Sequence, residues 1–331
     1  MIGKISTTSK ALPHIGCEEM RRLLSMSAAV EVLRSAFRDF DASTLILRAA
    51  HELPAGAFLF MPASDSKHVG VKMVGVAPGN AKMNIATVQA IYVLFDAHTL
   101  APLATMQGDA LTDIRTPAVS ALATDLAARS DARHLAIVGS GAQATGHVLS
   151  MLAVRPIETI SIVARNRETA EQLVAFAQGC GITDVRVAGR EALAQADIIC
   201  TCTTSTTPVV NSTDVSEGCH INAVGAFNAS MRELDAQLMA RGRIMVENRP
   251  SALREAGDIL QAMEEGVLDE EAMVADLREA VTGTPLRRNT KDVTIFKSVG
   301  IAFEDLVVAS EIYRLWSAAR LSDGGCAGNT L

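Results

Sequence analysis

An apolar segment that runs into a glycine-rich turn constrains the fold of this chain more than any other feature. Residues 135–144 read Leu-Ala-Ile-Val-Gly-Ser-Gly-Ala-Gln-Ala, which fits the spacing G-x-G-x-x-A. Gly139 permits a tight turn after a buried strand, Gly141 lets the backbone approach a pyrophosphate, and Ala144 allows a helix to pack closely on that strand. The free N–H groups at the start of the helix would face the phosphates. The segment therefore predicts a dinucleotide-binding turn, against the alternative of a turn that only shapes the sheet.

The sequence around this turn alternates between short apolar runs and helical patterns. Strands are expected at His134–Val138, Thr159–Ala164, Asp184–Val187, Asp197–Cys202, His220–Val224, Arg243–Val246 and Val293–Phe296, and helices at Gln143–Ala153 and Glu168–Gln178. Strands that are buried on both faces and alternate with helices are typical of a parallel α/β sheet. This part of the chain is therefore predicted to be a Rossmann domain.

The N-terminal part shows a different pattern, a helix followed by strands that short turns separate. The helix is expected over Glu18–Phe40 and the strands at Thr44–Ala50, Ala57–Met61, Val69–Ala77 and Val88–Phe95. Two further helices are expected, Ile114–Arg129 with Pro117 in its first turn, and Ile301–Ala319, where Glu304 and Asp305 suit the helix dipole. Strands joined by short turns favour an antiparallel sheet. The predicted fold class is α/β, a Rossmann domain plus an α+β domain, which 331 residues accommodate.

Composition and charge exclude several classes of partner. The net charge is −7 and aromatic residues make up 4% of the chain, so a nucleic-acid surface is not expected. No apolar stretch is long enough to cross a membrane, and Met1–Lys10 is too polar for a secretory leader. The cysteines and histidines show no metal-ligand spacing. We expect a cytoplasmic protein with buried reduced thiols at Cys200 and Cys202, and with no metal, nucleic acid or membrane as partner.

The end of the strand after the glycine turn bears on the kind of dinucleotide. An NAD site usually places an aspartate or glutamate there, against the ribose 2′-hydroxyl. This strand ends in Arg165-Asn166-Arg167, which offers two guanidinium groups and no carboxylate. Guanidinium groups bind a phosphate through charge-assisted hydrogen bonds. We predict that NADP(H) is preferred, with NAD(H) accepted as well if Arg165 stacks on the adenine or lies in solvent.

Three basic residues stand in apolar surroundings upstream of the turn. Arg48 and Lys72 lie in expected strands, and Arg115 opens the expected helix after Asp113. A charge inside an apolar strand is costly unless it is paired. Because no carboxylate partner is obvious nearby in the sequence, the three residues suggest an anionic ligand. Taken singly, each also fits an edge-strand charge, a lysine that reaches solvent, or a local ion pair between Arg115 and Asp113.

Several motifs spread along the chain point to one family. They are Gly70-Val71-Lys72, Pro78-Gly79-Asn80, Leu111–Thr116, Gly139–Ala144, Thr201–Pro208, Asn222–Ala226 with Glu233-Leu234-Asp235, Glu255–Asp258 and Thr294–Gly300. Together they are specific, and the sequence from about Arg48 to Ser317 resembles the ornithine cyclodeaminase/mu-crystallin family.

The resemblance implies two domains and a homodimer. The substrate-binding and dimerisation domain would comprise residues 1–118 and 305–331, and the NAD(P)-binding Rossmann domain residues 119–304. Arg48, Lys72 and Arg115 match positions that hold the α-carboxylate of the substrate and face the reacting carbon, and Val299 matches a residue that lines the same site. The full set of expected cofactor contacts is Thr87, Arg115, Gly139, Gly141, Ala142, Gln143, Arg165, Asn166, Arg167, Thr203, Thr204, Val224, Gly225 and Ser298.

One position departs from the cyclodeaminases of this family. Their loop after the Val-Gly pair carries an aspartate, which handles the amino group of the substrate as ammonia leaves and the ring closes. The matching residue here is Phe227. A phenyl ring neither accepts nor donates a proton, so the sequence points to the family's reductases and amino-acid dehydrogenases. Phe227 would instead form an apolar wall of the substrate site.

The leading hypothesis is NAD(P)H-dependent reduction of a small α-imino acid to the L-amino acid. The substrate would be a cyclic ketimine, such as Δ1-pyrroline-2-carboxylate or Δ1-piperideine-2-carboxylate, or iminosuccinate. Arg48 and Arg115 would fix its carboxylate, and Lys72 would contact the carboxylate or imine and supply a proton. The alternatives are an amino-acid dehydrogenase of alanine-dehydrogenase type, a non-catalytic NADPH-binding protein of crystallin type, and a cyclodeaminase that recruits another acid.

Overall fold

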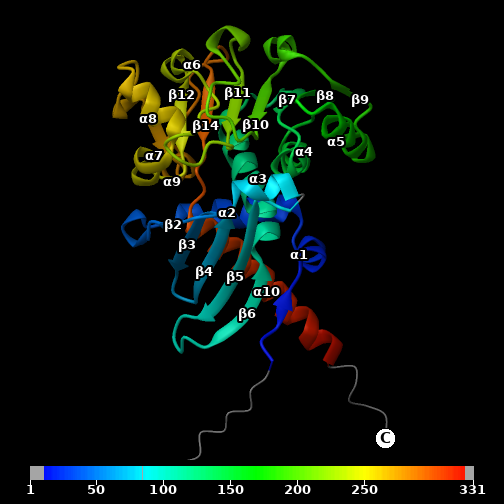
Figure 1. Cartoon of the computed structure of the whole chain (residues 1–331), viewed down its shortest axis with the longest axis vertical. Coiled ribbons are helices and arrows are strands. Elements are labelled where there is room, and N and C mark those ends of the chain that lie inside the picture. Colours follow the sequence, from blue (N-terminus) through cyan, green and yellow to red (C-terminus); the bar gives the residue numbers. More distant parts are fainter. Residues whose placement is uncertain (1–10, 84, 325–331) are drawn as a thin grey trace, which may run out of the picture.

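The computed structural model describes residues 11–83 and 85–324, and its strands form two sheets (Figure 1). The larger sheet comes from the second half of the chain and has strands β7 (His134–Val138), β8 (Thr159–Val163), β9 (Asp184–Val187), β10 (Ile198–Thr201), β11 (His220–Ala223), β12 (Arg243–Val246), β13 (Met273–Asp276) and β14 (Thr294–Lys297). All its pairings are parallel, and the order is β13-β12-β14-β11-β10-β7-β8-β9. The order reverses between β7 and β10, and ligands of such sheets bind beside that point, at the carboxyl ends of the strands.

Helices connect the strands of this sheet, and several begin at a capping side chain. They are α4 (Ala142–Val154), α5 (Arg167–Gly179), α6 (Ala236–Arg241), α7 (Arg249–Glu255), α8 (Gly257–Glu264) and α9 (Leu277–Val281). Asn166, Asp235, Asn248 and Asp276 each accept a backbone N–H of the first turn that follows them. The expected Rossmann architecture is confirmed.

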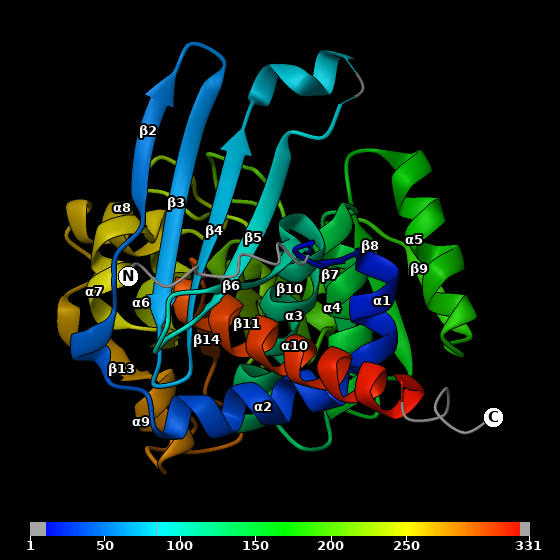
Figure 2. The same cartoon turned by 90° about the horizontal axis from the view of Figure 1, so that it is seen from below.

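The smaller sheet comes from the N-terminal part of the chain. Its strands are β1 (His14–Ile15), β2 (Ala49–Leu53), β3 (Gly56–Ser64), β4 (His68–Val76), β5 (Val88–Asp96) and β6 (Pro102–Gln107), in the order β1-β6-β5-β4-β3-β2. All pairs are antiparallel except β1 with β6. One face packs on α10 (Ala302–Gly324), beside which lie α1 (Cys17–Leu23) and α2 (Met26–Arg38) (Figure 2). Because side chains alternate along a strand, Lys72 and its register partner Tyr92 share the face toward α10.

Helix α3 (Gly108–Ala127) lies between the two sheets and is buried along most of its length. It contacts α2, α4 and α10 as well as strands of both sheets, so it fixes how the sheets sit relative to each other. Its closest approach to α4 is at Gly146, where a Cβ would lie 2.5 Å from Cγ of Pro117.

The start of α3 corrects an expectation from the sequence. The pattern predicted a helix that begins at Ile114, with Pro117 in its first turn, but the helix begins at Gly108. Glycine reads as a turn residue, yet here it is required by packing, because a Cβ would lie 2.8 Å from the Ala90 backbone. Pro117 therefore lies inside the helix, and Arg115 stands about two turns after its start rather than at its opening.

Two other expectations near the N-terminus are also wrong. The single helix predicted over Glu18–Phe40 is divided into α1 and α2, because the Ser25 hydroxyl accepts the N–H of Ala28 and starts a new helix. The strand predicted over Thr44–Ala50 begins only at Ala49, after a short 3-10 turn and an irregular stretch. Arg48 consequently precedes β2 instead of lying in a strand. Strands β6 and β13 were not predicted.

Some expectations fall outside what the structure tests. The domain boundaries after residue 118 and before residue 305 stay a prediction, and both positions fall inside helices, α3 and α10. Met1–Lys10 lies outside the described residues. Within the described part of the chain, no helix is long and apolar enough to span a membrane, and no group of His, Cys, Asp or Glu side chains could hold a metal ion.

Replacing Gly146 by alanine should destabilise the protein, because the added methyl group would press on Pro117 across the α3–α4 contact. Overpacking of a tight contact costs about 1–3 kcal/mol. Urea unfolding should show a lower midpoint at an unchanged slope. The matched control is Gly179→Ala in α5, where the Cβ position has no atom within 4 Å and the substitution reports helix propensity alone. Equal stability of the two variants would show that the α3–α4 contact accommodates the added methyl group without a loss of unfolding free energy.

Candidate active site

The glycine-rich turn follows β7 at the point where the strand order reverses. Gly139 has a φ of 112°, and a Cβ there would lie 2.7 Å from the carbonyl oxygen of Cys202, so both backbone and packing require glycine. Gly141 precedes the first residue of α4, Ala142, and its Cβ position has no neighbour within 4 Å. Ala144 is fully buried. The open side of the turn at Gly141 fits the approach of a pyrophosphate to the helix N-terminus.

A buried glutamate, Glu233, ties the ends of β10 and β11 together beside this turn. Its Oε1 accepts hydrogen bonds from the Thr203 N–H (2.7 Å) and hydroxyl (2.8 Å), and its Oε2 accepts one from the Gly225 N–H (2.7 Å). A side chain at Gly225 would overlap the Thr203 backbone. Thr203, Val224 and Gly225, three of the expected cofactor contacts, therefore lie together, whereas Thr204 is exposed.

A second buried pair, Asp258 with Lys297, supports Glu233. Asp258 Oδ1 accepts the backbone N–H of Glu233 (2.7 Å), and its Oδ2 lies 3.0 Å from Lys297 Nζ. Lys297 also donates to the carbonyls of Ala223 (3.1 Å) and Ala226 (2.6 Å). In the sequence, Glu255–Asp258 stood out only as one of the motifs that carry the family resemblance. In the structure Glu255 ends α7, and Asp258 lies in the first turn of α8.

A third buried carboxylate, Glu247 after β12, fixes the segment that follows β14. It accepts hydrogen bonds from the Ser298 hydroxyl and from the N–H groups of Val299 (3.1 Å) and Gly300 (3.0 Å). Gly300 has a φ of 73°, and a Cβ there would overlap the Arg115 guanidinium. Two expected site residues, Ser298 and Val299, are thereby fixed in the segment whose Gly300 lies against Arg115.

The end of β8 carries the residues expected to distinguish the two dinucleotides. Arg165 is exposed and makes no hydrogen bond or ion pair with any described residue. Asn166 caps α5 by accepting the Thr169 N–H (3.2 Å), and Arg167 pairs with Glu171 (2.7 Å). Of the two guanidinium groups, Arg165 is therefore the one that remains available.

The expected local pair between Asp113 and Arg115 does not form. Asp113 Oδ1 instead accepts the side-chain amide of Gln143, at 2.9 Å, and burial raises the pKa of this carboxyl. Gln143 stands in the first turn of α4, beside the glycine turn. Thr87, another expected cofactor contact, is half-buried just before β5, and its carbonyl accepts the Ala77 N–H (2.8 Å).

Lys72 and Arg115 share one carboxylate, Asp305, in the first turn of α10. Lys72 Nζ lies 2.9 Å from Oδ1 and 2.8 Å from Oδ2 of Asp305, and 3.1 Å from the Thr112 hydroxyl. Arg115 donates from Nε to Asp305 Oδ1 (3.1 Å) and from Nη1 to Glu304 Oε2 (3.0 Å). Lys72 is 2% exposed, Arg115 6%, and both carboxylates 0%. We call these four residues, Lys72, Arg115, Glu304 and Asp305, the α10 charge cluster.

Arg48 lies next to this cluster. Its guanidinium pairs with Glu255 and donates to the carbonyls of Phe227 (3.0 Å) and Val299 (3.3 Å). A narrow cavity is lined by Arg48, Met61, Gly300 and neighbouring residues. Residues 299–305 thus contact all three basic side chains, and the structure brings them together beside the loop that carries Phe227.

The pairing overturns one step of the sequence argument. Because no carboxylate is close in the sequence, Arg48, Lys72 and Arg115 were expected to be unpaired and to bind an anionic ligand. In the folded chain, however, each of them has a carboxylate partner. These partners stand 189 to 233 residues away in the sequence. Sequence spacing gave no signal for them, apart from the place of Glu255 in a shared motif.

Burial shifts the protonation equilibria of this cluster. Burial, followed by the charge of Arg115, lowers the pKa of Lys72 to about 8, while Asp305 acts in the opposite direction. Burial also raises the pKa of Glu304 well above its usual range, and Glu247 adds to that effect. Lys72 can therefore exchange a proton near neutral pH.

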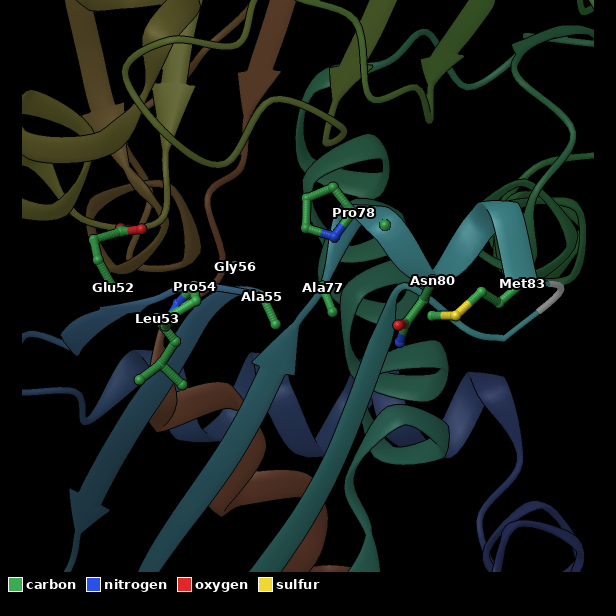
Figure 3. Close-up of a pocket in the computed structure, with 10 residues that line it drawn as sticks. Glu52, Leu53, Pro54, Ala55, Gly56, Ala77, Pro78, Asn80 and Met83 are labelled. Atoms are coloured by element: carbon green, nitrogen blue, oxygen red, sulfur yellow. The ribbon is translucent and has the colours of Figure 1, made fainter.

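An open pocket of about 490 Å³ lies between the β2–β3 turn and the segment after β4 (Figure 3). Its lining consists of Glu52, Leu53, Pro54, Ala55, Gly56, Ala77, Pro78, Gly79, Asn80 and Met83. The lining includes the Pro78-Gly79-Asn80 motif but none of the three basic residues. The groups suited to bind and protonate a substrate lie at the α10 charge cluster instead.

The parallel sheet with a glycine turn at its reversal point defines a Rossmann-type dinucleotide-binding protein, here joined to a second sheet that carries a buried charge cluster. The profile of the ornithine cyclodeaminase/mu-crystallin family matches residues 15–320, and the chain belongs to this family. Over 309 residues it is 36% identical to the Δ1-pyrroline-2-carboxylate reductase of Bacillus cereus, and the match covers 90% of this chain and 95% of that relative.

Solved structures share the fold. That of Thermococcus litoralis Δ1-pyrroline-2-carboxylate reductase, in complex with NADH and L-proline, matches with a TM-score of 0.89 at 33% identity, over 93% of this chain and 98% of that one. An archaeal alanine dehydrogenase dimer with bound NAD matches with a TM-score of 0.88 at 28% identity, over 93% and 97% of the two chains. The expected fold class and the expected similarity to the reductase branch are both confirmed.

Alanine at Gly141 should weaken dinucleotide binding without a loss of stability. Its Cβ would occupy the open side of the turn, where no protein atom lies within 4 Å, so it would obstruct only a ligand. Gly139→Ala provides the contrast, because it should also destabilise the fold through its contact with Cys202. Fluorescence titration with NADH and NADPH measures binding, and thermal unfolding measures stability. If Gly141→Ala bound the dinucleotides as tightly as the wild type, the turn would not be part of the cofactor site.

Proposed function

We propose that this protein reduces a small α-imino acid to the L-amino acid with NAD(P)H. The substrate is a cyclic ketimine, such as Δ1-pyrroline-2-carboxylate or Δ1-piperideine-2-carboxylate, or iminosuccinate. One observation carries the proposal. Buried Arg115 lies against Gly300, which follows β14, and buried Lys72 shares Asp305 with Arg115, while the carboxyl end of β14 lies at the same sheet edge as the dinucleotide turn. Similarity to Δ1-pyrroline-2-carboxylate reductases, one of them solved with NADH and L-proline, supports the same substrate class.

The reaction needs an oriented substrate. Hydride adds to the imine carbon, the C=N π electrons move to nitrogen, and nitrogen takes up a proton. A bound nicotinamide supplies the hydride. Arg48 and Arg115 bind the substrate carboxylate through charge-assisted hydrogen bonds, each worth about 1.5–3 kcal/mol, and thereby hold the imine carbon toward the nicotinamide.

Lys72 supplies the proton to the imine nitrogen in this proposal. Its ammonium is buried beside Arg115, and its pKa of about 8 leaves it charged at neutral pH but ready to release a proton. Imine reduction should accordingly slow as the pH rises through the pKa of Lys72, because the protonated form is the acid.

Phe227 and Val299 form the apolar wall of the proposed substrate site. The backbone carbonyl oxygens of both residues accept hydrogen bonds from Arg48. Both residues therefore lie next to the position that a substrate carboxylate bound to Arg48 would take. A phenyl ring supplies no acid or base, which leaves the cyclodeaminase reaction without the group that handles the departing amine.

We also propose a preference for NADP(H). Arg165 is exposed at the end of β8, where a 2′-phosphate would lie, and has no partner within the described chain. Acceptance of NAD(H) belongs to the same proposal, because the two similar solved structures hold NADH and NAD.

The proposed assembly is a homodimer formed through the smaller sheet. The sheet face opposite α10 carries a half-exposed apolar surface of Phe58, Phe60, Val71, Met73, Ile91 and Val93. A contiguous exposed apolar surface of this kind marks an interface, and two-fold dimers are the commonest assembly. The similar alanine dehydrogenase is a dimer.

The cysteines support placing the protein in a reducing cytoplasm. Cys17, Cys180, Cys200, Cys202 and Cys219 are free thiols. Burial raises the pKa of Cys200 and of Cys219 to about 12, which keeps these two thiols unreactive.

The second candidate function is an amino-acid dehydrogenase that interconverts L-alanine with pyruvate and ammonia. The similar archaeal alanine dehydrogenase favours it, and the same basic groups would bind the carboxylate. It differs from the first candidate in its substrate, because a free 2-oxo acid and ammonium must then enter the site together.

A substrate panel distinguishes the two candidates. With NADPH, preformed cyclic ketimines should be reduced faster than pyruvate with ammonium, because the ketimine already carries the C=N bond. The loss of absorbance at the nicotinamide band, followed with NADPH and with NADH, gives kcat/KM for each pair. Faster turnover of pyruvate with ammonium would favour the dehydrogenase, and dinucleotide binding without turnover on any substrate would refute both.

Lys72→Met should reduce kcat far more than it reduces NADPH affinity. The variant removes the proposed acid, a loss of about 10²–10⁴-fold in rate, and leaves the glycine turn intact. Steady-state kinetics and NADPH titration are the two measurements. A variant with wild-type kcat would exclude Lys72 as the proton donor.

A further inference from the structure

The carboxylate of Asp305 joins three separate elements. It stands in the first turn of α10, contacts Lys72 on β4 with both oxygens (2.9 and 2.8 Å), and accepts Nε of Arg115 from α3 (3.1 Å). No other described side chain contacts both basic groups with a carboxylate. It stands in the first turn of the helix, where the dipole favours a negatively charged side chain.

The surroundings of Lys72 leave Asp305 as its main counter-charge. From α3 it faces Arg115 and the Thr112 hydroxyl, from β5 it is paired in register with buried Tyr92, and from α10 it faces Asp305 and Glu304. Glu304 accepts no hydrogen bond from Lys72 and accepts one from Arg115 instead. Without Asp305, the Lys72 ammonium would face Arg115, the Thr112 hydroxyl and Tyr92, and the remaining acidic neighbour would be Glu304, which bonds Arg115.

We propose that Asp305 is the positioning residue of this site: it fixes the Lys72 ammonium and the Arg115 guanidinium at one separation and keeps Lys72 charged until the substrate arrives. The inference rests on the proposed function, because Lys72 and Arg115 matter to the reaction as acid and carboxylate ligand. Asp305 acts through these two groups and does not itself meet the substrate. The role assigned to it from sequence, a carboxylate that suits the helix dipole, is only part of its function.

The first experiment measures Lys72 without any need for turnover. The full chain is labelled with [ε-13C]lysine, the Lys72 resonance is assigned with Lys72→Arg, and its titration is followed by NMR. Wild-type Lys72 should titrate near pH 8. In Asp305→Asn the titration should move down by about 1–3 pH units, because an opposite charge in contact has been removed.

Glu304→Gln is the matched control. It removes a carboxylate of equal burial from the same helix turn, but one that bonds Arg115 rather than Lys72, so it should move the Lys72 titration less. Equal displacement in both variants, or none in Asp305→Asn, would overturn the proposal.

The second experiment separates position from charge. Asp305→Glu keeps the charge but lengthens the side chain by one methylene group, so Lys72 should stay charged while kcat falls, by up to about 10²-fold for a misplacement of this size. Asp305→Asn should lower kcat and move the alkaline fall of activity to lower pH. Wild-type kcat in Asp305→Glu would overturn the positioning role, and this variant carries the test if thermal unfolding shows that Asp305→Asn does not fold. If the wild type reduces no imino acid, the proposed function fails, whereas the NMR titration still decides the role of Asp305.

Discussion

Two cations and two carboxylates with almost no access to water make up the α10 charge cluster, and the rest of the site is arranged around it. Taking a charge out of water costs several kcal/mol, which a close partner repays only in part, so such a cluster is a poor source of stability. What it offers is a set of oriented charges in dry surroundings, where their attraction for a substrate is stronger than in water. The fold supports that arrangement from three sides, with β4 carrying Lys72, α3 carrying Arg115 and α10 carrying both carboxylates.

Buried carboxylates also hold other groups in place along the carboxyl edge of the larger sheet. Glu233, Glu247 and Asp258 are buried carboxylates that accept backbone N–H groups of loops after the strands. Each loop is thus fixed by hydrogen bonds from its backbone to a buried carboxylate, in addition to the packing of its buried side chains. Glu247 links the two regions directly, because the segment it holds places Gly300 against Arg115. The positions of cofactor and substrate groups are therefore preorganised by common supports.

Local sequence patterns sufficed for the larger sheet, apart from its edge strand β13, and failed where contacts are distant. The G-x-G-x-x-A turn and the alternation of strands and helices depend on neighbouring residues, so β7, α4 and the strands beside them could be read directly. The start of α3 at Gly108 could not, because it depends on a close approach to Ala90, a tertiary contact. The three basic residues could be singled out because charges in apolar runs are conspicuous. Their partners Glu255, Glu304 and Asp305 were not, because a pairing across about 200 residues leaves no periodic trace.

Arg48, Lys72 and Arg115 are all paired with carboxylates of the protein. How they could also bind the carboxylate of a substrate therefore needs a physical explanation. The raised pKa of Glu304 favours the uptake of a proton, and a protonated Glu304 would still accept the Arg115 hydrogen bond through one oxygen while contributing no charge. The cluster then contains two cations and a single carboxylate, and its surplus positive charge matches the carboxylate of an α-imino acid. Glu247 forms no ion pair with either cation of the cluster, since its oxygens accept hydrogen bonds from Ser298, Val299 and Gly300, and its charge acts on Arg115 only through space. On this view the two acidic residues of α10 have different roles. Asp305 holds Lys72 and Arg115 in place, whereas an uncharged Glu304 leaves part of the positive charge of these two residues unpaired, so that it can attract the substrate carboxylate.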